Sequence, residues 1–270
     1  MKKVRFSRSF LAIPYALFMT VFVVVPLFFV LYYSLRDDVT GELTFGNFVT
    51  FFSTPVNLRV AVRSFFIAFL STIACLIIAY PVAYIVARSN LKNKSALLLI
   101  FIVPMWVNFV LRINALKELL DLMGLINKSS GWDIFNTVLG MVYDFLPFMI
   151  LPIYTTILKI DKSYLEAARD LGANEAKAFL SVTLPLSKAG ILSGVSMVFL
   201  PSMTNYVVSN WMTNNKVTII GGFIDFAFLN DSWGRGSVTA IVLLLLMFLF
   251  TYLTGGFKNE ESATKGKALW

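Results

Sequence analysis

A carboxylate inside an apolar stretch is the first feature of this sequence that could take part in chemistry. Asp144 interrupts the run VYDFLPFMILPIY, and an ionisable residue in such a run is costly unless it is shielded or serves a pathway. Carboxylates and aromatic faces are natural partners of organic cations, because ring faces attract positive charge. We therefore predict a path for a cation, lined by these side chains: Asp144, Tyr143, Trp106, Tyr206 and Asp225.

Several of these residues also have a purely structural interpretation. Asp144 could pair with a basic residue such as Arg112. Arg112 and Arg63 are awkward for a cation path, and we expect them to reach toward the membrane surface or to face a partner protein. Asp225 and Asp231 could be solvated loop charges or contacts for a docking protein. The tryptophans could belong to the aromatic belt at the membrane interface: Trp106, Trp211 and Trp233.

A polar segment, residues 161–185, separates two apolar stretches and reads DKSYLEAARDLGANEAKAFLSVTLP. Ser163 and Glu166 fit a capping box, in which each side chain satisfies a backbone N–H at the start of a helix. The pattern predicts a short helix over residues 164–171.

The same segment contains the signals for a second short helix. Gly172 suits the end of the first helix, since glycine takes the left-handed conformation without a Cβ penalty. Asn174 can cap the next helix, which we expect to end before Pro185. Two short helices joined at one glycine would form a compact cytoplasmic projection.

This segment resembles the EAA signature of the permeases of ATP-binding-cassette (ABC) importers. The signature is EAA, three residues, glycine, nine residues, isoleucine, one residue and Leu-Pro. Val182 replaces the usual isoleucine, and the matching positions are Glu166, Ala167, Ala168, Gly172, Leu184 and Pro185. The resemblance implies that residues 159–187 form a coupling loop, which docks in a groove of the ATP-hydrolysing subunit.

The residue types also restrict the chemistry of the chain. It contains no G-x-x-x-x-G-K-[ST] phosphate loop, so ATP hydrolysis would need a separate chain. Without histidine and with one cysteine, Cys75, we expect no metal site. The prediction is a transport subunit and not an enzyme, with no cofactor of its own; the partner ATPase would bind ATP and Mg.

Further segments resemble the PotB-type permeases of spermidine/putrescine importers. They are Val142–Tyr154, Leu200–Ser202, Asn205–Tyr206 and Ile220–Gly222. The resemblance implies a polyamine substrate, a second (PotC-like) permease, an ATPase homodimer (PotA-like) and an extracytoplasmic substrate-binding protein (PotD-like). It also implies the type I importer, or MetI-like, fold. Another organic cation, iron or sulfate remains an alternative substrate, and an ion-coupled secondary transporter an alternative class.

Apolar stretches must position these residues. The chain is 58% hydrophobic and 14% charged with a mean hydropathy of +0.77, which favours a membrane protein over a soluble one. A spanning helix needs about 20 apolar residues. Six stretches qualify: 10–34, 61–87, 95–113, 134–158, 188–209 and 237–256. We predict an all-α polytopic protein with a membrane domain over 10–256 and tails at 1–9 and 257–270.

The charges predict the orientation of this domain. If the chain begins in the cytoplasm, 15 of its 23 Lys and Arg residues fall in cytoplasmic segments. We therefore expect both termini in the cytoplasm of a bacterial cell, with the chain in its plasma membrane. The net charge of +8 then reports topology, and no nucleic-acid partner is expected. Gly190 and Gly194 are spaced for close helix packing, which would suit contact with the partner permease.

Overall fold

A computed structural model describes residues 12–89, 93–126 and 128–255 of the 270. The predicted tails at 1–9 and 257–270, with their basic residues, lie outside this part of the chain. Within it the protein is helical, and its only extended pairing is an isolated bridge between Arg36 and Leu43.

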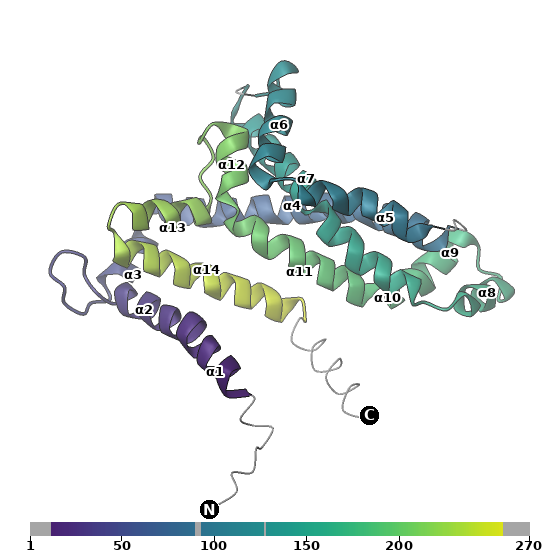
Figure 1. The fold of residues 1–270 in the computed structure, drawn as a ribbon, viewed down its shortest axis with the longest axis horizontal. Coiled ribbons are helices and arrows are strands. Elements are labelled where there is room, and N and C mark those ends of the chain that lie inside the picture. The colour runs from purple at the N-terminus through teal and green to yellow at the C-terminus, as the bar shows by residue number, and fades with distance from the viewer. Residues whose placement is uncertain (1–11, 90–92, 127, 256–270) are drawn as a thin grey trace, which may run out of the picture. The chain divides into compact units, whose positions relative to one another are not determined.

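The helices follow one another with short connections (Figure 1). The α-helices are α1 (Ile13–Met19), α2 (Val25–Ser34), α3 (Gly46–Ser53), α4 (Pro55–Arg88), α5 (Lys94–Ile102), α6 (Phe109–Leu122), α7 (Ser130–Leu158), α8 (Lys162–Asp170), α9 (Glu175–Ala178), α10 (Leu184–Leu186), α11 (Lys188–Thr204), α12 (Tyr206–Thr213), α13 (Ile220–Leu229) and α14 (Trp233–Leu253). Thr20–Val24 and Phe179–Thr183 are π-helical, and Val103–Trp106 is a 3₁₀ turn.

Four continuous helical segments are long and apolar enough to cross a membrane. They are Ile13–Ser34, Pro55–Arg88, Ser130–Leu158 and Trp233–Leu253. Two further segments qualify only as bent pairs, Ala96–Trp106 with Phe109–Leu122 and Glu175–Leu186 with Lys188–Thr204. The described residues thus hold up to six spans, as many as the sequence predicts.

Two of the expected continuous stretches are broken. The stretch 95–113 bends by 94° after Trp106, where Val107 is extended and Asn108 caps α6 through its side chain. Pro104 contributes to this break, since proline removes a backbone donor. The stretch 188–209 ends at Thr204, and Asn205 starts the separate helix α12. A further apolar helix, α13, lies between α12 and α14 along the chain.

The chain divides into two compact units. Of the described residues, the first unit takes 12–59 and 223–245, and the second takes those within 60–222 and 246–255. In the first unit the Asp38 side chain accepts a hydrogen bond from the Gly234 amide at 2.7 Å, at the start of α14. Tyr33 packs on Trp233 with 5.4 Å between ring centroids. These contacts join the end of α2 and the following turn to α14.

The core of the second unit is built around α7. α11 packs along α7, and Gly190 and Gly194 make this possible. A Cβ on Gly190 would lie 2.5 Å from Thr156 Oγ1, and one on Gly194 would lie 2.7 Å from Met149 Sδ. The predicted close packing therefore exists, but its partner is α7 of the same chain and not a second permease.

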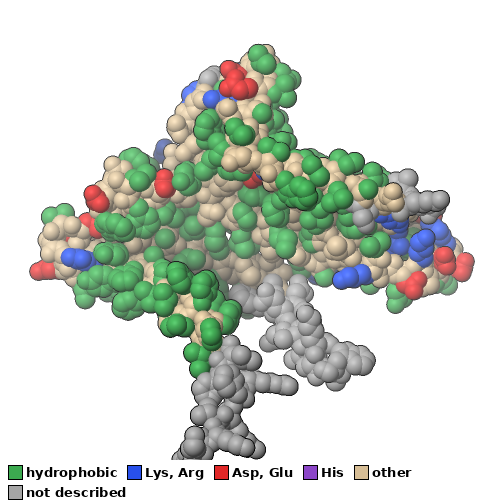
Figure 2. Space-filling view, in the orientation of Figure 1, with side chains coloured by type: hydrophobic (Ala, Val, Ile, Leu, Met, Phe, Trp, Pro, Cys, Tyr) green, Lys and Arg blue, Asp and Glu red, His purple; other side chains and the backbone are tan. Residues whose placement is uncertain are grey.

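Charged side chains of the second unit gather at its two ends. Figure 2 shows Lys, Arg, Asp and Glu around α8 and α9 and again near the tip of α6, with hydrophobic side chains on the helices between them. Many of the intervening apolar side chains are exposed, including Ile77, Ile85 and Ile100. Exposed apolar surface between two charged ends is what a lipid-embedded helical bundle requires.

Candidate functional site

Helix α8, in the predicted coupling loop, begins two residues earlier than the sequence suggests. Asp161, and not Ser163, is its N-cap, and the Asp161 carboxylate accepts a hydrogen bond from the Ser163 amide at 3.0 Å. The predicted capping box between Ser163 and Glu166 is thus wrong. Aspartate is as common as serine at the N-cap, because either side chain can accept a hydrogen bond from a free backbone amide of the first turn. The hydrogen bond from the Ser163 amide lowers the pKa of Asp161.

Gly172 ends α8 as the sequence predicts. It is left-handed, with φ +83°, and no atom lies within 4 Å of where a Cβ would stand. The Gly172 amide donates to the Arg169 carbonyl at 2.8 Å and the Ala173 amide to the Ala168 carbonyl at 3.0 Å. These two bonds form a Schellman motif, which turns the chain sharply out of the helix.

The second helix of the loop is longer than expected. Asn174 caps α9 by accepting from the Lys177 amide at 2.8 Å, as predicted. Pro185 does not end the helical path, because α9, the π-helical segment and α10 continue without interruption to Leu186. Pro185 lies within this path, two residues beyond the end of the π-helical segment Phe179–Thr183.

The signature residues differ in exposure. Glu166, Ala167 and Pro185 are exposed, whereas Ala168 and Leu184 are half-buried. Beside them Leu171 is 89% exposed, which leaves an apolar side chain next to the turn at Gly172. Such a surface is available to another protein.

An ion pair joins the two helices across Gly172. Arg169 Nη2 and Glu175 Oε1 lie 2.7 Å apart, with both side chains exposed. The hydrogen bond to Glu175 raises the pKa of Arg169. An exposed pair of this kind adds little stability, so the turn geometry itself defines the shape of the loop.

Two contacts join the loop to the end of α4. Arg88 Nη1 donates to the carbonyl of Ile160, where the loop begins, at 3.3 Å. The Phe179 ring, beyond α9, meets Tyr80 and Tyr84 edge-on at centroid distances of 5.6 and 5.3 Å. One helix therefore holds both ends of the loop.

Asp144 forms a buried ion pair with Arg112. Arg112 Nη2 donates to Asp144 Oδ1, and the two side chains are only 9% and 10% exposed. The Arg112 guanidinium also lies 5.7 Å from the centroid of the Tyr143 ring. The pairing considered from the sequence is confirmed, and the expectation that Arg112 extends to the membrane surface is wrong.

The other predicted path residues lie on other elements than α6 and α7. Trp106 is 80% exposed in the 3₁₀ turn before the 94° break, in keeping with an interface residue. Tyr206 begins α12 and packs against the core of the second unit. Asp225 is half-buried in α13, within the first unit. Their part in a substrate path stays a prediction.

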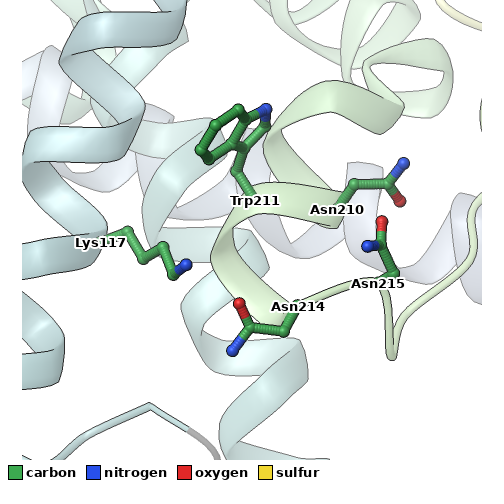
Figure 3. Close-up of a pocket in the computed structure, with 5 residues that line it drawn as sticks. All are labelled: Lys117, Asn210, Trp211, Asn214 and Asn215. Carbon is green, nitrogen blue, oxygen red and sulfur yellow. The ribbon is translucent and has the colours of Figure 1, made fainter.

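A polar hollow that the sequence analysis missed lies between α6 and the end of α12. It has a volume of about 360 Å³, and Figure 3 shows Lys117 of α6 extending toward α12. Asn214 and Asn215, both left-handed, form the turn that closes it. The lining residues are Lys117, Asn210, Trp211, Asn214 and Asn215. Consecutive asparagines tolerate positive φ, which is the signal that marks this turn.

Comparison with known proteins decides the family. The sequence profile described as "Binding-protein-dependent transport system inner membrane component" matches residues 79–258, two thirds of the chain. The chain belongs to this family. It is a permease of the ABC importer class, built to pass several times through the cell membrane.

Curated relatives of this permease share its length as well as its sequence. The spermidine/putrescine permease PotB of Escherichia coli is 36% identical over 230 residues, with 79% of this chain and 83% of the relative covered. PotB of Haemophilus influenzae is 36% identical over 224 residues, 78% of each chain. The PotB homolog of Mycoplasma genitalium is 29% identical, covering 90% of this chain and 89% of its own.

A solved structure shows the same fold. The permease resembles a chain of a bacterial alginate ABC transporter, crystallised in complex with an alginate-bound periplasmic protein, with a TM-score of 0.70. The two chains are 14% identical, and 91% of each is covered. The predicted all-α, MetI-like importer fold is confirmed.

Proposed function

We propose that this permease imports a polyamine, spermidine or putrescine, as a membrane subunit of an ATP-driven importer. The observation that carries the proposal is the 36% identity to spermidine/putrescine permeases over 79% of the chain. The residue types of the predicted path agree with it, because a carboxylate such as Asp144 and a ring such as Tyr143 suit a flexible polycation.

The partners follow from the same class of transporter. The importer would contain a second permease, two copies of an ATPase and an extracytoplasmic substrate-binding protein. A periplasmic substrate-bound protein is present in the crystallised complex of the structural neighbour, which supports the last of these. Both termini would lie in the cytoplasm, in agreement with the distribution of Lys and Arg.

The loop of residues 159–187 would dock in a groove of the ATPase, which binds ATP and Mg. The exposed side chains of Glu166 and Leu171, on either side of the last turn of α8, support this assignment. Movement of the ATPase dimer would then tilt the helices and open the cavity alternately to each side. The substrate must contact the outward-open and inward-open states differently, because a ligand that binds both with equal affinity does not change their populations.

The test is uptake by the purified importer in proteoliposomes, with labelled spermidine and putrescine and with the binding protein present. We expect uptake that requires ATP inside the vesicle and persists without an ion gradient. Excess sulfate or ferric iron should not compete. Uptake that follows an ion gradient without ATP would contradict the class, and competition by another solute alone would contradict the substrate.

A further inference from the structure

The bend between α10 and α11 is held by a buried hydroxyl pair. The helical segments Glu175–Leu186 and Lys188–Thr204 meet at 63°, with Ser187 fully buried between them. Ser187 Oγ lies 3.0 Å from the Leu184 carbonyl, to which it donates, and 2.8 Å from Tyr80 Oη. A serine hydroxyl has one hydrogen, so Tyr80 is the donor in the second bond.

The helix before the bend is held against α4. Phe179 lies edge-on to both Tyr80 and Tyr84, at interplanar angles of 88° and 87°. Tyr80 therefore contacts this segment at two places eight residues apart, Phe179 and Ser187. Edge-to-face contacts depend on the orientation of the rings, so they favour one placement of this segment on α4.

The helix after the bend is held against a different helix. Gly190 lies against Pro152 and Thr156, and Gly194 lies against Met149, all on α7. Neither glycine position has room for a Cβ, so α11 is packed tightly on α7. Ser187 is the joint between a segment fixed to α4 and a helix fixed to α7.

We propose that Tyr80 is a positioning residue of the coupling step. Its bond to Ser187 fixes the angle of the joint, so that displacement of the coupling loop reaches α11 as a rotation. Without the bond, the angle between the two helical segments can change. Part of the displacement of the coupling loop would then alter this angle and would not move α11. This inference rests on the proposed function, since it concerns the link between ATP hydrolysis and uptake.

The test compares Tyr80→Phe with wild type in the reconstituted importer. Binding-protein-stimulated ATP hydrolysis should stay within about twofold, while polyamine moved per ATP falls by roughly 3- to 10-fold, the range spanned by one buried hydrogen bond. Tyr84→Phe is the matched control. It removes the same atom from the other tyrosine that packs on Phe179, and it should leave the ratio unchanged.

A double-mutant cycle separates positioning from simple support of the fold. If the two hydroxyls act through their shared hydrogen bond, the double variant Tyr80→Phe with Ser187→Ala should lower the polyamine moved per ATP no further than the worse single variant does. If Tyr80 only supports the fold, Tyr80→Phe should lower the melting temperature, ATP hydrolysis and uptake together and leave the polyamine moved per ATP unchanged. This result would overturn the inference.

The proposed function and this inference fail in different ways. A wild-type importer that hydrolyses ATP without moving polyamine overturns the proposed substrate. Wild-type uptake with an unchanged ratio in Tyr80→Phe overturns the role of Tyr80 alone.

Discussion

Arg112 of α6 and Asp144 of α7 form a buried ion pair, and the same guanidinium lies over the ring of Tyr143. One side chain of the protein thus occupies two of the five groups that the sequence predicts would line a cation path. α6 follows the 94° break, so the pair also fixes the direction in which the chain leaves that break. A structural role and a place in the path make different predictions for the two residues.

If Asp144 receives the substrate, removing Arg112 should free a site that a polyamine can fill. Arg112→Gln leaves a buried carboxylate unpaired and should lower the melting temperature of the importer. Spermidine should restore it, because a ligand that binds the folded state stabilises that state. Asp144→Asn should show no such rescue and should raise the KM for uptake at least about 10-fold, equivalent to about 1.4 kcal/mol.

The double variant, Arg112→Gln with Asp144→Asn, decides between the two roles. A place in the path predicts that it transports as poorly as Asp144→Asn. Near-wild-type uptake by this neutral pair would instead show that the ion pair is structural.

Gly172→Val should uncouple ATP hydrolysis from uptake. Valine at φ +83° is strained by about 1–2 kcal/mol or more, and the Schellman turn that shapes the coupling loop would be distorted. Gly124→Val is the matched control, since Gly124 ends α6 at φ +65° with the same pair of backbone hydrogen bonds and equally open space. Equal loss of coupling in the two variants would refute a special role for the loop.

Close packing of α11 on α7 should depend on both glycines. Gly190→Ala places a Cβ 2.6 Å from the Pro152 carbonyl oxygen, and overpacking of this kind costs about 1–3 kcal/mol. The melting temperature of the purified permease should fall. Gly131→Ala, near the start of α7, meets nothing closer than 4.0 Å and should not lower it.

The cap of α8 should weaken only in acid. A carboxylate whose folded-state pKa is lowered stabilises the fold above its unfolded value and loses that effect as pH falls through the lowered one. Protection of the Ser163 amide from hydrogen exchange should therefore be constant near neutrality and fall below the ordinary pKa of 3.8 for Asp161. The Lys177 amide, bound by Asn174, is the internal control, because an amide cap does not titrate in this range. Parallel loss at both amides would contradict this account.

The sequence predicts the membrane class and the two short helices within residues 159–187 because both depend on local patterns. Apolar length alone identified the stretches, and glycine and asparagine marked the turns of the loop. The N-cap was wrong because Asp161 and Ser163 offer nearly equivalent acceptors two residues apart. The sequence alone does not show which of two such neighbouring residues caps the helix.

Features that depend on tertiary contacts were beyond the sequence. The break after Trp106 divides a stretch that reads as continuously apolar, and proline content does not say which helix bends. The packing of Gly190 on Thr156 joins residues far apart in the chain, so the spacing of small residues showed close packing but not its partner. The Tyr80–Ser187 bond spans 107 positions and had no signal in either segment.

The central claim is that the turn at Gly172 lies against the ATPase, and crosslinking tests it most directly. Leu171→Cys in a Cys75→Ala background leaves one cysteine in the permease, because Cys75 is the only cysteine of the natural sequence. Leu122→Cys, at the end of α6, is matched in exposure, 87% against 89%. With a benzophenone maleimide attached, Leu171→Cys should crosslink to the ATPase in the assembled importer and Leu122→Cys should not. Crosslinking of Leu122→Cys to the ATPase, with none from Leu171→Cys, would contradict the account.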